Sequence, residues 1–161
     1  VSGFELFTSE TAGSSANDIA LTFQQSAKGA ADVTVTKVPS DGFWSHTWMQ
    51  KPMTMSGWNA RPTVDAFLTI AHMNGGSWNE TMWGSDQFDQ LIIAARAELD
   101  EAKRAQMYCD MQHMLNDDGG FVNAVFQNQL EASAKNVMGY EPHPVGSLGG
   151  FFQVARNLWL A

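Results

Sequence analysis

Two adjoining segments in the middle of the chain restrict its fold most strongly, because each carries a helical stripe of apolar residues. Residues 85–99 place apolar side chains three or four positions apart, and residues 100–115 do so again after Asp100, a good N-terminal cap. Two long helices in succession argue against an all-β sandwich or barrel. The two stripes consist of Phe88, Leu91, Ile92, Ala95 and Leu99, then Ala105, Tyr108, Met111, Met114 and Leu115.

The residues before these helices alternate between strand-like and helix-like patterns. Residues 4–8 are rich in strand formers, residues 32–36 alternate Val with Thr, and residues 52–58 resemble a third strand. A helix is predicted from Ser15 to Gly29, between the first two strands, and a shorter one lies before the third. This order predicts an α/β fold whose sheet has crossover helices.

The remaining segments are assigned by their start and stop signals. A helix can begin at Pro62 or Thr63, and a Gly- and Asn-rich loop follows at 74–84. The acidic pair Asp117 and Asp118 is expected in the turn after the second long helix. Residues 121–128, FVNAVFQN, are predicted to form a fourth strand.

Composition excludes several classes of partner. The 161 residues suit one domain, and 44% of them are apolar, as in a globular chain. A net charge of −8 argues against nucleic acid or an anionic bilayer as partner, since both require clustered cations. The sequence holds no apolar run of about 18 residues, the length that a membrane-spanning helix needs. The single Cys109 excludes an internal disulfide and is expected to pack rather than react.

The sequence offers no catalytic constellation. Its four histidines are dispersed without the spacing of metal ligands, and His113 is most simply a solvated residue. Neither a G-x-S-x-G elbow, nor a C-x-x-C pair, nor a phosphate-binding glycine loop is present. We therefore expect no catalytic residue, no metal ligand and no cofactor.

Tryptophan is the more informative residue type, because the chain has six of them. We assign Trp44, Trp48 and Trp83 to core packing. Trp58 stands at the carboxyl end of the third predicted strand beside polar groups, and Trp78 stands in a Gly-rich loop. For these two, packing and a pocket wall remain equal alternatives.

Arg61 follows Trp58 and Asn59 at a strand-to-helix turn, where open α/β sheets place their ligands. In one interpretation it pairs with Asp65, one helical turn further on. In the other it faces a cleft and binds a carboxylate or phosphate oxygen, helped by the N-terminal end of the following helix. Asn59 would then be an orienting amide.

Several of these segments together resemble the extracytoplasmic solute-binding proteins of peptide/nickel-type (family 5) ABC importers. The resemblance covers most of residues 1–130. The residues that carry it are Gly57–Trp58, then Asn79, Trp83 and Phe88–Asp89, then Asp100, Arg104 and Tyr108.

The resemblance implies one lobe of a two-lobed type II periplasmic-binding-protein fold. Residues 1–130 would form the second, C-terminal ligand-binding lobe, and residues 131–161 a tail returning towards a first lobe that is absent from this chain. Such receptors are periplasmic, have no catalytic activity and deliver a small solute to a membrane permease. Without the first lobe, the tail residues Phe151, Phe152 and Trp159 are expected to expose apolar surface or to be covered by a neighbouring chain.

The chain departs from that family at one position of the predicted site. Peptide binders of this kind often carry an aspartate three residues after the tryptophan of the G-W pair, where it holds the amino terminus of the peptide. Here that position is Arg61. The reversed charge predicts a peptide-like or other small solute with an anionic group, bound by Trp58, Asn59, Arg61 and Trp78. The alternative is an aromatic-rich carbohydrate-binding or protein-interaction module acting alone.

Overall fold

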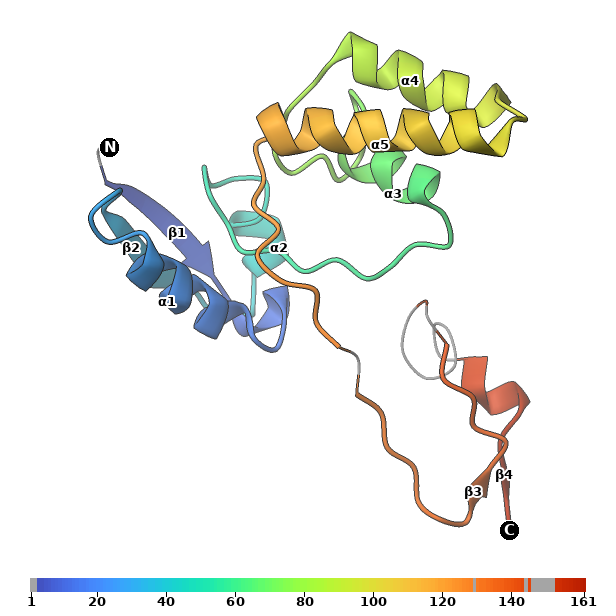
Figure 1. The fold of residues 1–161 in the computed structure, drawn as a ribbon. Coiled ribbons are helices and arrows are strands. Elements are labelled where there is room, and N and C mark those ends of the chain that lie inside the picture. The colour runs from blue at the N-terminus through green and yellow to red at the C-terminus, as the bar shows by residue number, and fades with distance from the viewer. Residues whose placement is uncertain (1–2, 129, 144, 146–152) are drawn as a thin grey trace. The chain divides into compact units, whose positions relative to one another are not determined.

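The chain divides after Trp58 into two units, Val1–Trp58 and Asn59–Ala161, which are described separately (Figure 1). The computed structural model describes residues 3–128, 130–143, 145 and 153–161. Within this part of the chain, none of the helices has the length and apolar character needed to cross a membrane.

The first unit is built on a parallel pair of strands, β1 (Phe4–Thr8) and β2 (Val33–Lys37). Helix α1 (Ala16–Ser26) connects them, so the predicted strand–helix–strand order is confirmed. A parallel pair requires such a crossover connection. Leu6, Ala20 and Val33 form the core between the strands and the helix.

The predicted third strand is reduced to one bridge, in which Thr54 pairs with Phe7 of β1 in parallel. Two backbone hydrogen bonds hold it there, from Phe7 N to the Met53 carbonyl (3.0 Å) and from Met55 N to the Phe7 carbonyl (2.8 Å). Beyond the bridge, Gly57 passes so close to the chain that a Cβ would collide with the Ala12 carbonyl oxygen. The position before Trp58 therefore requires glycine.

A second core in the first unit lies under the 3₁₀ helix η1 (Glu10–Ala12) and the short helix α2 (Phe43–His46). Phe43 is fully buried there, with Trp48 packed against the cluster. The assignment of Trp44 to the core is wrong, because its side chain is 46% exposed. Trp44 follows Phe43 by one residue and so points about 100° away from it around the helix.

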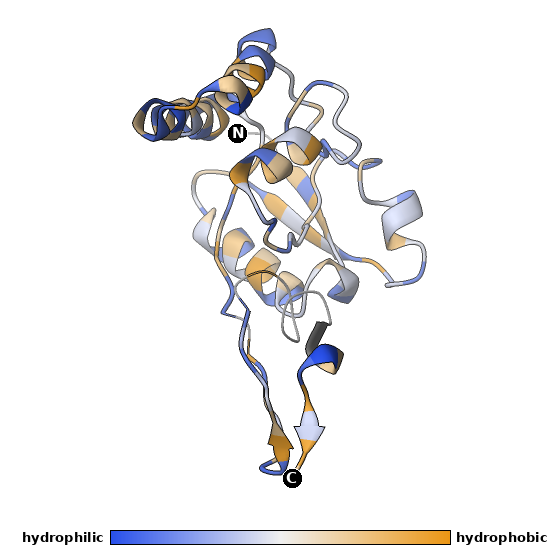
Figure 2. Ribbon diagram, turned by 90° about the vertical axis from the view of Figure 1, so that its right-hand side faces the viewer, coloured by the Kyte–Doolittle hydropathy of each residue, from blue (hydrophilic) through white to orange (hydrophobic). Residues whose placement is uncertain are grey.

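In the part of the second unit that the structure describes, the α-helices are α3 (Val64–Ala71), α4 (Asp86–Ala97) and α5 (Glu101–Asp118). Each begins after a side-chain cap, namely Thr63, Ser85 and Asp100. Figure 2 shows hydrophobic and hydrophilic residues mixed along the helices, as in amphipathic helices. Their apolar faces share one core made of Leu68, Phe88, Ile92, Ala95, Met111 and Leu115.

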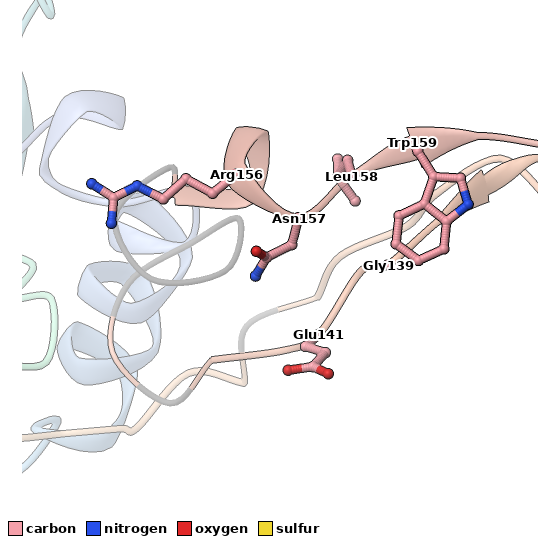
Figure 3. A pocket seen from close by; sticks show the side chains of 6 residues that line it. All are labelled: Gly139, Glu141, Arg156, Asn157, Leu158 and Trp159. Atoms are coloured by element: carbon pink, nitrogen blue, oxygen red, sulfur yellow. The ribbon is translucent and has the colours of Figure 1, made fainter.

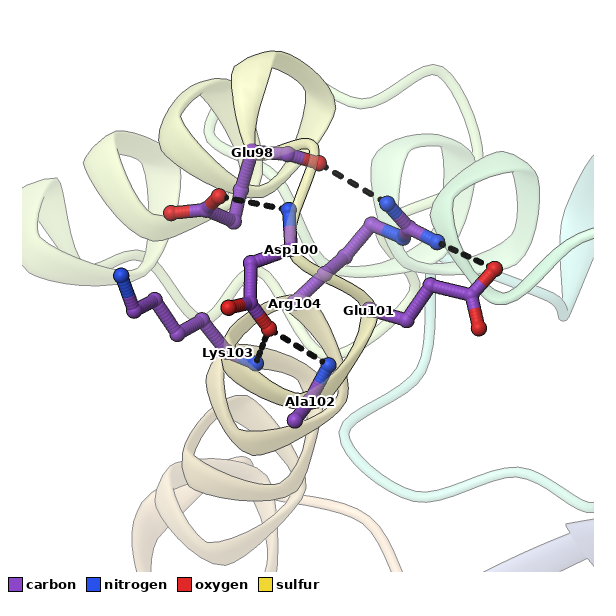
Figure 4. A network of polar contacts seen from close by, with 6 residues as sticks. All are labelled: Glu98, Asp100, Glu101, Ala102, Lys103 and Arg104. Carbon is purple, nitrogen blue, oxygen red and sulfur yellow. Dashed lines mark hydrogen bonds and ion pairs between the residues drawn. The ribbon is translucent and has the colours of Figure 1, made fainter.

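A network of polar contacts fixes the corner between α4 and α5 (Figure 4). The Asp100 carboxylate accepts hydrogen bonds from the N–H groups of Ala102 (3.0 Å) and Lys103 (3.1 Å). Arg104 donates to the backbone carbonyl of Glu98 (2.8 Å), at the end of α4. Asp100 and Arg104, two of the residues that carry the resemblance, thus build a helix corner, and the predicted cap is confirmed.

Several expectations for these helices are wrong, among them the place of Ala105 on the apolar stripe, since it is exposed. Leu99 is 90% exposed, because α4 ends at Ala97 and Leu99 lies in the corner. Cys109 is exposed, since it stands two residues, about 200°, from the buried Met111. Asp117 and Asp118 form the last turn of α5 rather than the turn after it. The expected exposure of His113 on α5 is confirmed.

The predicted fourth strand is also wrong, because residues 121–128 form neither strand nor helix. After them come β3 (Val137–Met138), the 3₁₀ helix η2 (Gln153–Arg156) and β4 (Trp159–Leu160). β3 and β4 pair antiparallel. Trp159 is 59% exposed, as expected for the tail, whereas Phe151 and Phe152 lie outside the described residues.

Candidate functional site

The structure places three of the four predicted ligand-binding residues in the second unit. Asn59 and Arg61 lie in the segment before α3, and Trp78 lies in the loop between α3 and α4. The fourth, Trp58, is the last residue of the first unit and is half-buried.

Arg61 lies over the ring of Trp78. The guanidinium carbon is 5.8 Å from the centroid of the Trp78 ring, which is the geometry of a cation–π contact. Arg61 Nη1 also donates a hydrogen bond to the backbone carbonyl of Asn59 (2.8 Å). The backbone carbonyl of Asn59 makes this contact, and the orienting role of its side-chain amide towards a ligand stays a prediction. Trp78 keeps 43% of its surface exposed.

Asp65, the alternative partner of Arg61, pairs with Arg96 of α4. Its Oδ1 lies 2.8 Å from Arg96 Nε, and Arg96 Nη2 donates to the Thr69 hydroxyl at 2.6 Å. This contact links α3 to α4. Asp65 and Thr69 lie one turn apart on α3, so the Arg96 side chain contacts both. Asp65 thus supports the packing of two helices.

Hydrogen bonds to α3 and within the loop fix the conformation of the loop that carries Trp78. Trp78 N donates to the Ile70 carbonyl of α3 (3.1 Å). The Asn79 side chain is buried and donates to the carbonyls of Met73 (3.3 Å) and Trp83 (2.7 Å). Buried amides of this kind fix loop geometry because their donors must be satisfied. Asn79, another residue that carries the resemblance, therefore holds the loop in place.

The assignment of Trp83 to the core agrees with its surroundings. Its ring meets that of Phe88 edge-on, with 5.2 Å between centroids. Its indole N–H donates to the Asp118 carboxylate (3.1 Å), which gives the last turn of α5 a contact to the loop.

His72, at the end of α3, is a buried titratable residue that sequence reasoning did not single out. Its side chain is 5% exposed, and neither ring nitrogen has a hydrogen-bond partner among the described residues. Its ring stacks on Phe121 at 5.0 Å and meets Phe67 edge-on at 5.5 Å. Burial lowers the pKa of His72, and the Glu80 carboxylate only partly opposes this shift.

We expect the stability of the second unit to fall as the pH drops below about 6.5, the ordinary pKa of histidine. The lowered pKa means that the unfolded chain takes up the His72 proton first, which favours unfolding by at most about 1.4 kcal/mol per pH unit. Urea unfolding between pH 5 and 7.5 measures this slope. His72→Phe should reduce it, and the exposed control His113→Gln should not. Equal slopes in all three chains would contradict the effect.

A separate cavity of about 450 Å³ lies beside the β3–β4 ribbon (Figure 3). Figure 3 shows Glu141 on one arm of the ribbon and Arg156, Asn157 and Trp159 on the other. Gly139 has a φ of 76°, and a Cβ there would collide with the Trp159 ring. No predicted site residue lines this cavity. The described residues also contain no group of three or more His, Cys, Asp or Glu side chains that could hold a metal ion.

Comparison with solved structures identifies the fold. The oligopeptide-binding protein AppA from Bacillus subtilis, in complex with a nonapeptide, matches 99% of this chain with a TM-score of 0.77 and 20% identity. The ABC transporter-associated periplasmic binding protein DppA from Helicobacter pylori, in complex with the peptide STSA, matches 99% with a TM-score of 0.78 and 23% identity. The chain shares the fold of the matched part of these solute-binding proteins.

Two further matches cover less of the chain, one to a nickel-bound structure and one to a protein sequence. NikA from Staphylococcus aureus, in complex with Ni(L-His)₂, matches 70% of the chain with a TM-score of 0.58 and 19% identity, and the match covers 24% of NikA. The dipeptide-binding protein DppE from Bacillus subtilis (strain 168) is 33% identical over 76 residues, 47% of this chain and 14% of DppE. No protein-family model matches the chain.

These matches confirm the resemblance to peptide/nickel-type binding proteins and the predicted α/β fold class. The chain spans only about a third of the solved proteins that match it throughout, 32% of AppA and 31% of DppA. It therefore has part of the periplasmic-binding-protein fold.

Proposed function

We propose that the chain is part of the solute-binding component of an ABC importer, which captures a small peptide-like solute and delivers it to the permease. The observation that carries this proposal is the match of 99% of the chain to peptide-bound AppA and DppA, at TM-scores of 0.77 and 0.78. Such proteins bind and release a molecule unchanged, so no catalytic residue is required. The receptor would act outside the cytoplasmic membrane, in the periplasm.

Residues 1–130 would serve as the second ligand-binding lobe and residues 131–161 as the tail towards the first lobe. The solute would lie between the lobes and favour their closure. A stand-alone carbohydrate-binding or protein-interaction module is less favoured, since 99% of the chain follows a part of larger receptors.

Within this receptor, Arg61 and Trp78 would bind an anionic group of the solute. The contact of the guanidinium with the indole and with the Asn59 carbonyl limits its freedom before the solute arrives. A planar guanidinium suits a carboxylate, to which it can donate two parallel hydrogen bonds. Trp58 stays a predicted apolar contact, and an orienting role of the Asn59 amide stays a prediction as well.

The test is to purify the complete receptor and identify its bound solute by native mass spectrometry followed by release in acid. We expect one small, carboxylate-bearing solute per receptor. Calorimetric titration of the 161-residue chain with that solute should give weak or undetectable binding, because part of the pocket wall is missing. Micromolar binding by this chain alone would contradict the two-lobed proposal.

A further inference from the structure

The loop that carries Trp78 is attached to the end of helix α5. The indole N–H of Trp83 donates a hydrogen bond to a carboxylate oxygen of Asp118, the last residue of α5, at 3.1 Å. Just beyond the helix, Gly120 lies against Thr81, since a Cβ on Gly120 would be 3.4 Å from the Cβ of Thr81. Both contacts join the loop to a helix that packs in the same core.

Asp118 occupies a position that is unfavourable for its own helix. The C-terminal end of a helix carries partial negative charge, so an acidic side chain in the last turn destabilises the helix. The last turn of α5 holds Asp117 and Asp118 and no basic residue. Asp117 accepts a hydrogen bond from Asn116 of the same helix, whereas Asp118 accepts one from the loop. A charged acceptor strengthens such a bond, which offsets the cost of the position.

Hydrogen bonds inside the loop connect Trp83 to Trp78. The backbone N–H of Trp83 donates to the Thr81 hydroxyl (3.3 Å), which in turn donates to the side-chain oxygen of Asn79 (3.2 Å). The Asn79 amide donates to the Trp83 carbonyl (2.7 Å), so the three residues form a closed set of contacts. Trp78 directly precedes Asn79. A displacement of Trp83 would therefore move the backbone next to the ring on which Arg61 lies.

We propose that Asp118 is a positioning residue of the solute-binding site. Through Trp83, it holds the loop in the conformation in which Trp78 supports Arg61. The inference rests on the proposed function, in which Arg61 and Trp78 bind an anionic group of the solute. The loop also contains two adjacent glycines, residues 75 and 76, whose backbone is intrinsically flexible. Without the contact to Asp118, the solute would have to order the loop as it binds, which lowers its affinity.

A double-mutant cycle in the complete receptor tests this role. Asp118→Ala removes the acceptor, and Trp83→Phe removes the donor but keeps an aromatic ring against Phe88. Each should weaken calorimetric binding of the recovered solute by about 3–10-fold, the range that one hydrogen bond gives. The double variant should bind as Trp83→Phe alone does, because Asp118 acts only through Trp83. Losses that multiply in the double variant would overturn the proposal.

Two substitutions in the same helical turn separate positioning from charge. Asp118→Asn keeps an acceptor oxygen and should recover most of the affinity that Asp118→Ala loses. Asp117→Ala makes the same change of charge one residue away and should stay within about 2-fold of the unmodified receptor. If Asp118→Asn recovers nothing, or if Asp117→Ala loses as much as Asp118→Ala, the positioning role is refuted.

Hydrogen exchange without solute distinguishes this proposal from solute capture. In the complete receptor, the amides of residues 77–83 should exchange at least about 5-fold faster in Asp118→Ala than in Asp117→Ala, because the loop opens more often. The amides of α4 provide the reference and should not differ. Equal exchange of the loop in both variants would overturn the positioning role even if a solute is captured. Faster exchange in a receptor that captures no solute would support the hold of Asp118 on the loop and reject the proposed function.

Discussion

Replacement of Phe88 by Ala is expected to destabilise the second unit by about 3–5 kcal/mol, the usual range for truncation of a buried aromatic side chain. Phe88 is fully buried, in the core that α4 shares with α3 and α5, and Trp83 packs edge-on against its ring. Its removal leaves a cavity that neighbouring helices fill only in part. Urea unfolding of the 161-residue chain, followed by helical circular dichroism, measures the loss.

Ile93→Ala provides the control on the same helix, because Ile93 is 57% exposed. Its effect should stay within about 0.5 kcal/mol, as for most surface substitutions. A loss of less than about 1 kcal/mol in Phe88→Ala would mean that the faces of α4 and α5 do not pack as described.

The helices were predictable from the sequence because their signals are local. The stripe through Phe88 and Ile92 repeats with the period of a helix, and Asp100 offers its carboxylate to N–H groups two and three residues on. The crossover in the first unit was predictable for a similar reason, since β1 and β2 bracket one helical pattern. Errors arose at helix ends and at the choice of face, as at Leu99 and Cys109.

The segment 121–128 shows where local signals fail. Val and Phe favour an extended chain, but a strand exists only when a neighbouring strand supplies hydrogen bonds. The choice of that neighbour is a long-range property, so sequence patterns indicated a strand that the described residues do not form.

In the candidate site, too, local features could be predicted from the sequence and long-range contacts could not. The spacing of Arg61 and Asp65 allowed a local ion pair as one of two alternatives, but Asp65 pairs with Arg96, 31 residues away. Helix α3 and part of the following loop separate Arg61 from Trp78 in the sequence, and no sequence pattern predicts their contact. His72 was missed because burial of a single histidine has no periodic signal of its own.

In the complete receptor, Arg61→Asp is expected to weaken binding of the recovered anionic solute at least about 100-fold. One charge-assisted hydrogen bond contributes about 1.5–3 kcal/mol, which corresponds to about 10–150-fold in affinity. The substitution removes this bond and adds repulsion between two carboxylates. Isothermal titration calorimetry measures the affinity, and circular dichroism verifies that the variant remains folded.

Two further variants separate the role of Arg61 from the net charge of the receptor. Lys103→Asp makes the same change of charge on the exposed surface of α5, where an acid in the first turn is tolerated, and should leave the affinity within about 2-fold. Arg61→Lys keeps the charge but loses the planar fork, so its affinity should lie between those of Arg61 and Arg61→Asp. Unchanged affinity in Arg61→Asp would remove the counter-charge from the proposed site, whereas a loss in both aspartate variants would assign the effect to long-range attraction.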